Sequence, residues 1–565
     1  MATTSSNTSG WPRRSVLKLL AGVGIGNAVF GRALVALAEE QPKVTSAMLS
    51  QAEWISGTEL TEEERELMLD GVNGLVADYT TNRQVELDNS VAPAVVFQPL
   101  AAGGSAPRTE VALTETASAR RPSSEEDLAF APVSRLARLL RSRQVSSVEL
   151  TRLYLERLER FDPQLECVIS LTSELAHEQA ERADREIAAG RYRGPLHGVP
   201  WGAKDLLAVA GYRTTWGAEP YKEQTIQETA TVARRLQEAG AVLVAKLTLG
   251  ALAWGDVWYD GTTKNPWNLE QGSSGSSAGS ASATAAGLVG FTIGTETLGS
   301  IVSPCTRCGT TGLRPTFGRV SRHGAMSLSW TMDKIGPVAR SVEDCALVFH
   351  AIQGADGLDL TAVDGPFDWP YPRDVRTLRV GYVPELFEDD RAAAMENADE
   401  ETKARVREWQ DFDRRTLDVL RSLGVELIPI ALPERYPVDG LGLILTAEAA
   451  CAFDDLTRSG RDDLLVRQIE NAWPNVFRQG QTIPAVEYLR ANRIRTLVMQ
   501  EMEEKLAGVD VYVNPSYGGN NLLVTNLTGH PCVVVPNGFR AGDGTPTSIT
   551  FMGKLYGESA ALALA

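Results

Sequence analysis

The sequence predicts an α/β fold in which helices cover both faces of a large mixed central β-sheet. A helical pattern over residues 229–239 ends at Gly240 and runs directly into the apolar stretch AVLVAKL at 241–247. The same order, helix, glycine and apolar run, recurs between residues 401 and 430. Glycine readily adopts the left-handed conformation that closes a helix, so each segment is typical of a helix followed by a buried strand. Helices that alternate with short apolar strands indicate a sheet covered on both faces.

Composition and charge exclude several classes of protein. The chain has 565 residues, of which 43% are hydrophobic and 22% charged, as in ordinary globular proteins. The net charge of −17 disfavours a nucleic-acid partner, because such a surface repels phosphates. Six cysteines are too few for a disulfide scaffold. Cys305 and Cys308 form a single CxxC without the further ligands that a zinc site needs, and whether they pair with each other stays open.

The first 38 residues have the order of a signal peptide. The stretch WPRRSVLK at 11–18 carries twin arginines, an apolar segment follows at 19–30, and Ala36-Leu37-Ala38 offers a small-residue cleavage site. The arginine pair predicts export by the twin-arginine route to the periplasm or the extracellular space. The apolar segment is too short to span a membrane, so no stable span is expected after the signal is removed.

Residues 39–127 form a separate region in this prediction. A helical pattern occupies 39–80, where Thr61 and Glu64 have the spacing of a capping box. Residues 83–126 are rich in Ala, Pro, Ser and Thr with little periodicity, which favours a linker or extended arm.

The main domain is predicted over residues 128–565. Ser146 and Glu149 have capping-box spacing before an amphipathic helix, and a second helix is expected near 173–189. Further strands are expected at 378–383, 509–514, 532–536 and 549–552. The last residues, ALALA, have a helical pattern, so we expect the natural chain to continue beyond Ala565.

Three short stretches carry the chemistry. HGVPWGAKD at 197–205 places Lys204 in an apolar run, where loss of solvation makes a lysine a neutral base. The Gly/Ser stretch at 265–288 runs into a helix-forming segment, so its hydroxyl and N–H groups gather at a helix start. GTETLGSI at 294–301 predicts a tight loop whose successive N–H groups form an oxyanion hole beside Ser300.

Together these motifs resemble the amidase signature family. The resemblance runs from about residue 128 to the end and includes GLRPTFGRVSRHG at 312–324, IGPVARSVED at 335–344 and TNLTGHPCVVVPNGF at 525–539. The ordered set of motifs is far more specific than any one of them.

The resemblance implies roles for individual residues. Ser300 matches the nucleophile, Ser276 the proton-relay serine and Lys204 the base. In the family a cis peptide bond precedes the relay serine, which here follows Gly275. The backbone N–H groups of Thr297, Leu298, Gly299 and Ser300 would form the oxyanion hole.

The implied reaction is hydrolysis of the carbon–nitrogen bond of a linear amide through an acyl-enzyme on Ser300. Its partners are a small-molecule amide and water, and it needs no metal or organic cofactor. The motifs leave the substrate and the oligomeric state open, a homodimer included.

The sequence departs from the family pattern near the site. Leu298 replaces the first of two glycines before the nucleophile, and Val302 replaces an arginine that often follows the Ser-Ile pair. Ser274 and Ala278 stand where glycine is usual. These changes put the substrate in doubt more than the reaction.

Three alternatives remain at this point. Residues 275–279 also match the GxSxG elbow of α/β-hydrolases, which would make Ser277 the nucleophile of an esterase, with a later Asp and His530 as partners. The glutaminase subunit of a tRNA-dependent amidotransferase shares the family motifs, although export and the N-terminal region argue against it. A non-catalytic binding protein on the same fold is the third, motivated by Leu298 and Val302.

Overall fold

The computed structural model describes residues 43–86, 95, 112–113, 120–393, 395 and 398–565. The predicted signal peptide at 1–38 lies outside the described residues, as does most of the linker predicted at 83–126.

A mixed sheet of eleven strands forms the centre of the molecule, in the order β1-β3-β2-β8-β10-β9-β14-β15-β13-β11-β12. β2 pairs in parallel with β3 and β8, and β11 pairs in parallel with β12 and β13, while the remaining pairs are antiparallel. The strands are β1 Val168–Leu171, β2 Pro200–Lys204, β3 Val242–Leu247, β8 Phe291–Glu296, β9 Thr311–Arg314, β10 Lys334–Ala339, β11 Val380–Tyr382, β12 Leu427–Pro429, β13 Val511–Pro515, β14 Cys532–Phe539 and β15 Pro546–Gly553. Two small ribbons pair β4 Val257–Trp258 with β5 Gly261–Thr262, and β6 Lys264–Asn265 with β7 Asn268–Gly272.

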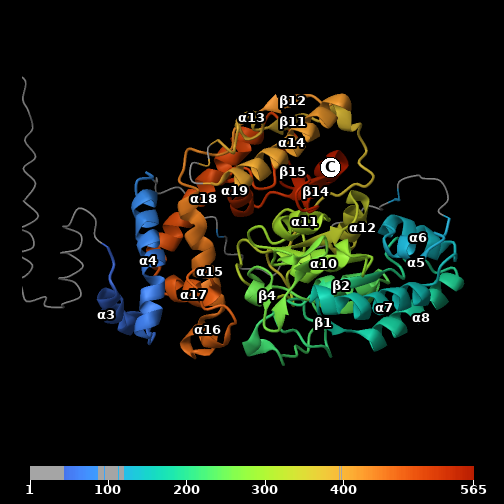
Figure 1. Cartoon of the computed structure of the whole chain (residues 1–565), viewed down its shortest axis with the longest axis horizontal. Helices are drawn as coiled ribbons and strands as arrows, with labels where there is room; N and C mark the ends of the chain where they lie inside the picture. Colours follow the sequence, from blue (N-terminus) through green and yellow to red (C-terminus); the bar gives the residue numbers. More distant parts are fainter. Residues whose placement is uncertain (1–42, 87–94, 96–111, 114–119, 394, 396–397) are drawn as a thin grey trace, which may run out of the picture.

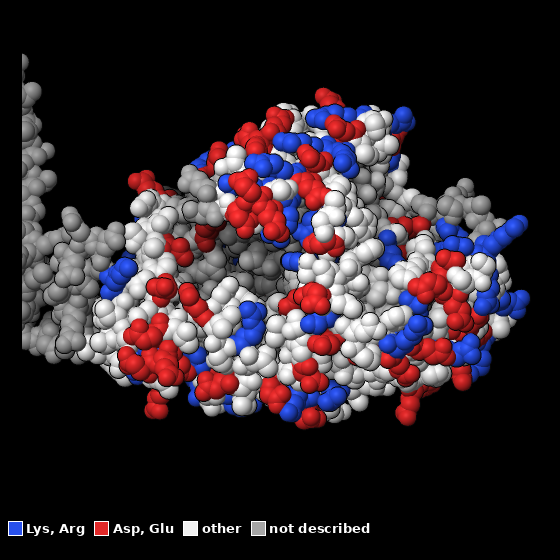
Figure 2. Space-filling model, in the orientation of Figure 1, with Lys and Arg blue, Asp and Glu red and all other residues white. Residues whose placement is uncertain are grey.

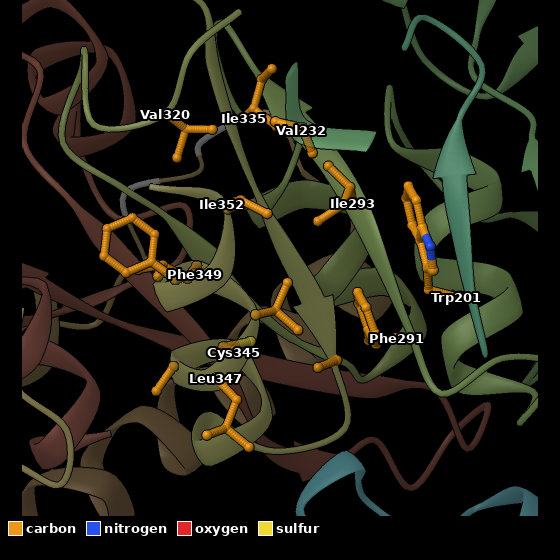
Figure 3. Packing of buried hydrophobic residues seen from close by; sticks show 14 of the residues in the cluster. Trp201, Val232, Phe291, Ile293, Val320, Ile335, Cys345, Leu347, Phe349 and Ile352 are labelled. Atoms are coloured by element: carbon orange, nitrogen blue, oxygen red, sulfur yellow. The ribbon is translucent and has the colours of Figure 1, made fainter. Parts of the chain in front are cut away.

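Helices cover both faces of this sheet, as predicted. Val242 and Val244 of β3 pack in one hydrophobic cluster with α7 and α8, whereas Leu243 belongs to another that contains α9 and α12. Figure 3 shows the second cluster, where Phe291 and Ile293 of β8 face the side chains of α12. The alternation follows from strand geometry, because successive side chains point to opposite faces.

The described helices connect and cover these strands (Figure 1). They are α3 Ser46–Ser56, α4 Glu62–Asn82, α5 Glu125–Ala129, α6 Val133–Arg141, α7 Ser147–Leu165, α8 Ser173–Ala188, α9 Thr231–Glu238, α10 Ala278–Ala285, α11 Val302–Cys308, α12 Val342–Ile352, α13 Pro384–Glu388, α14 Glu400–Ser422, α15 Leu443–Ala452, α16 Asp454–Arg458, α17 Trp473–Gly480, α18 Ala485–Leu506, α19 Asn521–Thr528 and α20 Glu558–Leu564. Short 3₁₀ turns are η1 Glu219–Tyr221, η2 Ala251–Ala253, η3 Val375–Thr377, η4 Asp439–Gly442 and η5 Arg461–Leu464.

Both predicted helix–glycine–strand units are present. α9 is followed by Gly240 with φ +83° and then β3, and α14 by Gly424 with φ +84° and then β12. The second strand is three residues long and shorter than predicted, because it pairs only with the short strand β11 at the edge of the sheet.

The N-terminal helices pack against the C-terminal part of the chain. Figure 1 shows α4 beside α17, and Arg478 of α17 contacts Glu64 of α4 at 2.6 Å. The capping box of Thr61 and Glu64 is complete. At α7 it is half formed: the Ser146 hydroxyl accepts from the Glu149 N–H, but the Glu149 carboxylate pairs with Arg121.

The described helices contain no segment long and apolar enough to cross a membrane. On the face drawn in Figure 2, acidic and basic side chains are interspersed, and a hollow opens between the upper and lower parts of the molecule.

Candidate active site

The start of α10 brings the Gly/Ser stretch against the central sheet. Every side chain from Ala278 to Thr284 is small and buried. The hydroxyls of Ser280 and Ser282 donate to the carbonyls of Ile293 and Lys264, so the serine-rich helix is buried with its polar groups satisfied. This packing sets Ser276 and Ser277 beside the ends of β2 and β8.

Lys204 is the last residue of β2, and its side-chain nitrogen lies close to three hydroxyls. Lys204 Nζ lies 2.8 Å from Ser276 Oγ, 2.8 Å from Thr295 Oγ1 and 3.1 Å from Ser277 Oγ. The Lys204 side chain is fully buried, and no carboxylate of a described residue lies within ion-pair distance of it.

The surroundings of Lys204 favour its neutral form. Burial lowers the pKa of Lys204 well below its ordinary value, while the negative charges of Asp333 and Glu296 act more weakly in the opposite direction. A neutral amine has one lone pair, so it can accept a hydrogen bond from one of its three hydroxyl neighbours. Lys204 can therefore take a proton from Ser276.

Ser300 lies on the loop between β8 and α11, next to the Ser276–Ser277 segment. The N–H of Ser277 donates to the Ser300 carbonyl at 3.1 Å, and Ser300 is half-buried. Within the described residues the Ser300 hydroxyl makes no hydrogen bond, so the structure brings Lys204 and Ser276 into direct contact but does not join Ser276 to Ser300. Catalytic hydrogen bonds often tighten only when substrate is bound.

The loop before Ser300 has unpaired backbone N–H groups, and glycine is needed at one position only. Among the described residues, the N–H groups of Thr297, Leu298, Gly299 and Ser300 have no acceptor. Gly299 has φ +86°, whereas Leu298 has an ordinary negative φ and its side chain is exposed. Leu298 therefore replaces a glycine without strain in the loop.

A buried ion pair between Glu296 and Arg314 stabilises the same loop. Glu296 Oε2 accepts from the N–H groups of Ile301 and Val302 at 2.9 and 3.0 Å, and Glu296 Oε1 accepts from Arg314 at 2.7 Å and from Asn526 at 2.9 Å. Burial alone would raise the pKa of Glu296, but the charge and hydrogen bonds of its partners lower that pKa to about 2. The ionised carboxylate thus fixes the residues that directly follow Ser300.

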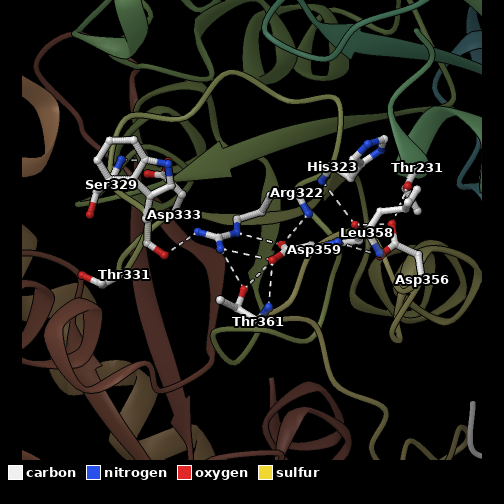
Figure 4. A network of polar contacts seen from close by, with 12 residues as sticks. Thr231, Arg322, His323, Ser329, Thr331, Asp333, Asp356, Leu358, Asp359 and Thr361 are labelled. Atoms are coloured by element: carbon white, nitrogen blue, oxygen red, sulfur yellow. Dashed lines mark hydrogen bonds and ion pairs between the residues drawn. The ribbon is translucent and has the colours of Figure 1, made fainter. Parts of the chain in front are cut away.

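A second carboxylate fixes the loop from the other side. Asp333 accepts from the Thr297 hydroxyl at 2.6 Å and from the N–H groups of Leu328 and Ser329. Figure 4 shows this segment beside Arg322, which pairs with Asp359 at 3.0 Å. A cavity of about 20 Å³ remains between Thr295, Thr297, Asp333 and their neighbours. Its size is that of a single water molecule.

The GxSxG alternative finds no support in this geometry. Ser277 is fully buried, and its hydroxyl donates to the Thr295 carbonyl and accepts from the Thr295 N–H, both at 3.1 Å. The preceding strand β7 belongs to a two-stranded ribbon outside the central sheet. His530 is buried and contacts Thr528. Ser277 therefore has the environment of a structural residue.

Other predicted features can be located as well. The peptide bond between Gly275 and Ser276 is cis. Cys305 and Cys308 are buried and unpaired, as are the other cysteines apart from Cys451, which is exposed and also unpaired. The described residues contain no group of three or more His, Cys, Asp or Glu side chains placed to hold a metal ion.

Several supporting residues were not singled out from the sequence. Thr295 and Glu296 lie inside the GTETLGSI motif, Arg314 inside GLRPTFGRVSRHG, and Asp333 two residues before IGPVARSVED. A charged residue inside an apolar, glycine-rich motif was the available signal, because a buried charge needs a partner. The sequence does not tell which partner it has.

Comparison with known proteins places the chain in a family. Residues 149–524 match the family model described as Amidase. A relative from Roseiflexus sp. (strain RS-1), which is one subunit of a glutamyl-tRNA(Gln) amidotransferase, is 35% identical over 463 residues. The match covers 74% of this chain and 92% of that protein.

Solved structures agree with this match. The native peptide amidase from Stenotrophomonas maltophilia is 28% identical with a TM-score of 0.66, covering 77% of this chain and 96% of its own. A chain from a vestigial protein complex related to an s-triazine catabolic enzyme is 26% identical with a TM-score of 0.67, over 77% of this chain and 97% of its own.

The Glu296–Arg314 pair generates a prediction with a defined pH dependence. Glu296→Gln leaves the Arg314 charge buried without a counter-charge, so unfolding at pH 7 should need about 3–5 kcal/mol less free energy than in the wild type. Because the folded-state pKa of Glu296 is lowered from 4.5 to about 2, the carboxylate stabilises the fold fully above 4.5 and progressively less as the pH falls towards 2.

Urea denaturation of both proteins at a series of pH values measures this difference. Glu270→Gln, which changes an exposed carboxylate, is the control and should match the wild type throughout. If the loss of unfolding free energy in Glu296→Gln stayed the same as the pH fell, the assignment of Glu296 as the ionised partner of Arg314 would be wrong.

Proposed function

Because this chain belongs to the amidase signature family, we propose that it hydrolyses the carbon–nitrogen bond of linear amides, with Ser300 as nucleophile, Ser276 as proton relay and Lys204 as base. The observation that carries the proposal is the environment of Lys204, which is fully buried and whose close polar neighbours among the described residues are uncharged hydroxyls. A lysine held in this way serves as a proton acceptor near neutral pH.

The first half of the reaction forms an acyl-enzyme. Neutral Lys204 takes the proton of the Ser276 hydroxyl as Ser276 takes the proton of Ser300. Ser300 Oγ then attacks the amide carbonyl carbon, and the carbonyl oxygen gains negative charge. The free N–H groups of residues 297–300 stabilise this oxyanion, a contribution of about 3–4 kcal/mol for one such donor in a comparable enzyme.

The second half returns the proton and releases the acid. Protonated Lys204 gives its proton back through Ser276 to the leaving amine nitrogen, so the carbon–nitrogen bond breaks and the amine departs. Water then attacks the Ser300 ester by the same route and frees the carboxylic acid. Glu296 and Asp333 keep their positions throughout and hold the loop that carries the oxyanion donors.

Labelling with a fluorophosphonate probe tests the three roles. Ser300→Ala should abolish labelling, and Lys204→Ala should slow it by about 10²–10⁴-fold near neutral pH because the general base is lost. Ser277→Ala is the matched control and should keep a labelled Ser300. Labelling that survives in Ser300→Ala but disappears in Ser277→Ala would favour the esterase elbow instead, and a wild type that is never labelled would favour a binding protein.

A glutaminase component of an amidotransferase is the second candidate, because the 35% identical relative belongs to a glutamyl-tRNA(Gln) amidotransferase. A glutaminase should release ammonia from glutamine, whereas the hydrolase proposed here should release ammonia or amine from other amides while glutamine stays intact. The measurement is ammonia and amine release across glutamine and a panel of fatty, aryl and peptide C-terminal amides, with Ser300→Ala as blank. Release from glutamine alone would select the second candidate.

We further propose that the protein is exported by the twin-arginine route, on the strength of Arg13, Arg14 and the apolar segment after them. Replacing both arginines by lysine should retain the protein in the cytoplasm, which fractionation of the host cells detects. Unchanged export of that variant would overturn this proposal.

A further inference from the structure

Three hydroxyls form a chain that joins the two catalytic loops to the surface. Ser274 Oγ lies 2.9 Å from Ser303 Oγ, which lies 2.8 Å from the phenolic oxygen of Tyr517. Ser274 is two residues before Ser276, and Ser303 is three residues after Ser300. The chain ends in the loop between β13 and α19, where Tyr517 is 49% exposed.

The backbone conformation of Ser274 indicates that its hydroxyl has a functional role. Ser274 has φ +60°, in the left-handed region that glycine enters freely and residues with a Cβ atom disfavour. Its side chain has one hydrogen-bond partner among the described residues, the Ser303 hydroxyl. A strained residue that could be glycine points to a use for the side chain.

The direction of the hydrogen bonds follows from counting donors. Each hydroxyl donates once. Suppose first that Tyr517 donates to Ser303 and Ser303 donates to Ser274. The last donor is then Ser274 Oγ, which is half-buried and has no further acceptor among the described residues. In the opposite direction, Ser274 donates to Ser303 and Ser303 donates to Tyr517, so the last donor is the exposed phenol. This second direction satisfies the half-buried groups and is favoured.

The phenolic proton of Tyr517 is then available to a ligand. Two further groups lie near it. The Ser303 carbonyl is at 3.5 Å, the outer limit of a hydrogen bond, and the Thr306 hydroxyl also interacts with the phenol while it donates to the Val302 carbonyl. The ring of Trp409 from α14 packs edge-on against the Tyr517 ring, with centroids 5.7 Å apart, and fixes its orientation.

Tyr517 also contacts the first turn of α11, the helix that directly follows the nucleophile loop. The Ser303 N–H donates to the Gly299 carbonyl at 2.7 Å, so Ser303 lies one α-turn from the nucleophile loop. Successive residues of an extended chain are about 3.3–3.6 Å apart. A carbonyl one or two residues away therefore lies about 3–7 Å from the scissile bond.

We propose that Tyr517 is a specificity-determining residue that donates a hydrogen bond to a second carbonyl oxygen of the substrate, so that the preferred amides carry a further carbonyl group near the scissile bond. A phenol is an uncharged hydrogen-bond donor, which matches a neutral carbonyl oxygen. This inference rests on the proposed amide hydrolysis and narrows its substrate class.

Two amides that differ in this carbonyl test the inference. N-acetylphenylalanine amide carries the second carbonyl, and 3-phenylpropanamide lacks it. Tyr517→Phe should lower kcat/KM for the first amide by about fivefold to tenfold, the effect of losing one neutral hydrogen bond, and leave the second unchanged. Tyr382→Phe, which removes a hydroxyl on β11 that donates to Glu388 of α13, is the matched control and should change neither.

Ser274→Gly separates the hydroxyl chain from backbone structure. Glycine adopts φ +60° freely, so this variant should keep or raise the melting temperature while it weakens selectivity for the acetylated amide by about twofold to threefold. A loss of kcat/KM that is equal for both amides in Tyr517→Phe would overturn the inference, since a merely structural role predicts that result.

A binding measurement keeps the two proposals distinguishable. Ser300→Ala protein can bind either amide without turnover, and adding Tyr517→Phe in that background should weaken calorimetric binding of the acetylated amide only. If the wild type hydrolyses neither amide, the proposed function fails for this class of compound. Equal binding by the single and double variants overturns the role of Tyr517 in either case.

Discussion

The buried amine of Lys204 is the constraint on which the rest of the site depends. It ends an interior strand of an eleven-stranded sheet and meets three hydroxyls at 2.8–3.1 Å without a carboxylate partner among the described residues. An isolated charge in such a place is strongly disfavoured, so the group can be kept there only in its neutral form or at a high free-energy cost. The parallel pairing of β2 with β8 sets Lys204 beside Thr295, and the small side chains of α10 let Ser276 approach.

Charged side chains surround the neutral Lys204 amine but make no ion pair with it. The Glu296–Arg314 pair and Asp333 bond to the backbone or hydroxyls of the nucleophile loop, which leaves four consecutive N–H groups free among the described residues. Their negative charges raise the pKa of Lys204, but less than burial lowers it. Rigid donors aimed at one point need little rearrangement when an oxyanion forms, which is the physical basis of electrostatic preorganisation.

Local patterns in the sequence predicted the helices and strands better than the contacts between their side chains. Gly240 and Gly424 mark real helix ends, because a left-handed residue is a local requirement. The same reasoning could not tell that Leu298 avoids the left-handed region while Ser274 enters it, since both stand where glycine is usual. The Glu149 carboxylate pairs with Arg121 and not with the backbone at the helix start, where the sequence predicted it. Glu296 binds Arg314 and Asn526. These are contacts between distant parts of the chain, which local sequence patterns do not predict. Family motifs supplied Lys204, Ser276 and Ser300; periodicity alone gave no sign that they meet.

The ionisation of Lys204 is the quantity that tests this account most directly. Titration of the lysine side chains by ¹³C–¹⁵N NMR, with the Lys204 signal assigned by its loss in Lys204→Met, reports the pKa without any substrate. We expect a pKa well below the ordinary 10.5, with Lys204 uncharged at the pH where the enzyme works. A Lys204 pKa at or above 10.5 would mean that the buried amine stays charged and cannot accept the Ser276 proton, and the proposed mechanism would be wrong.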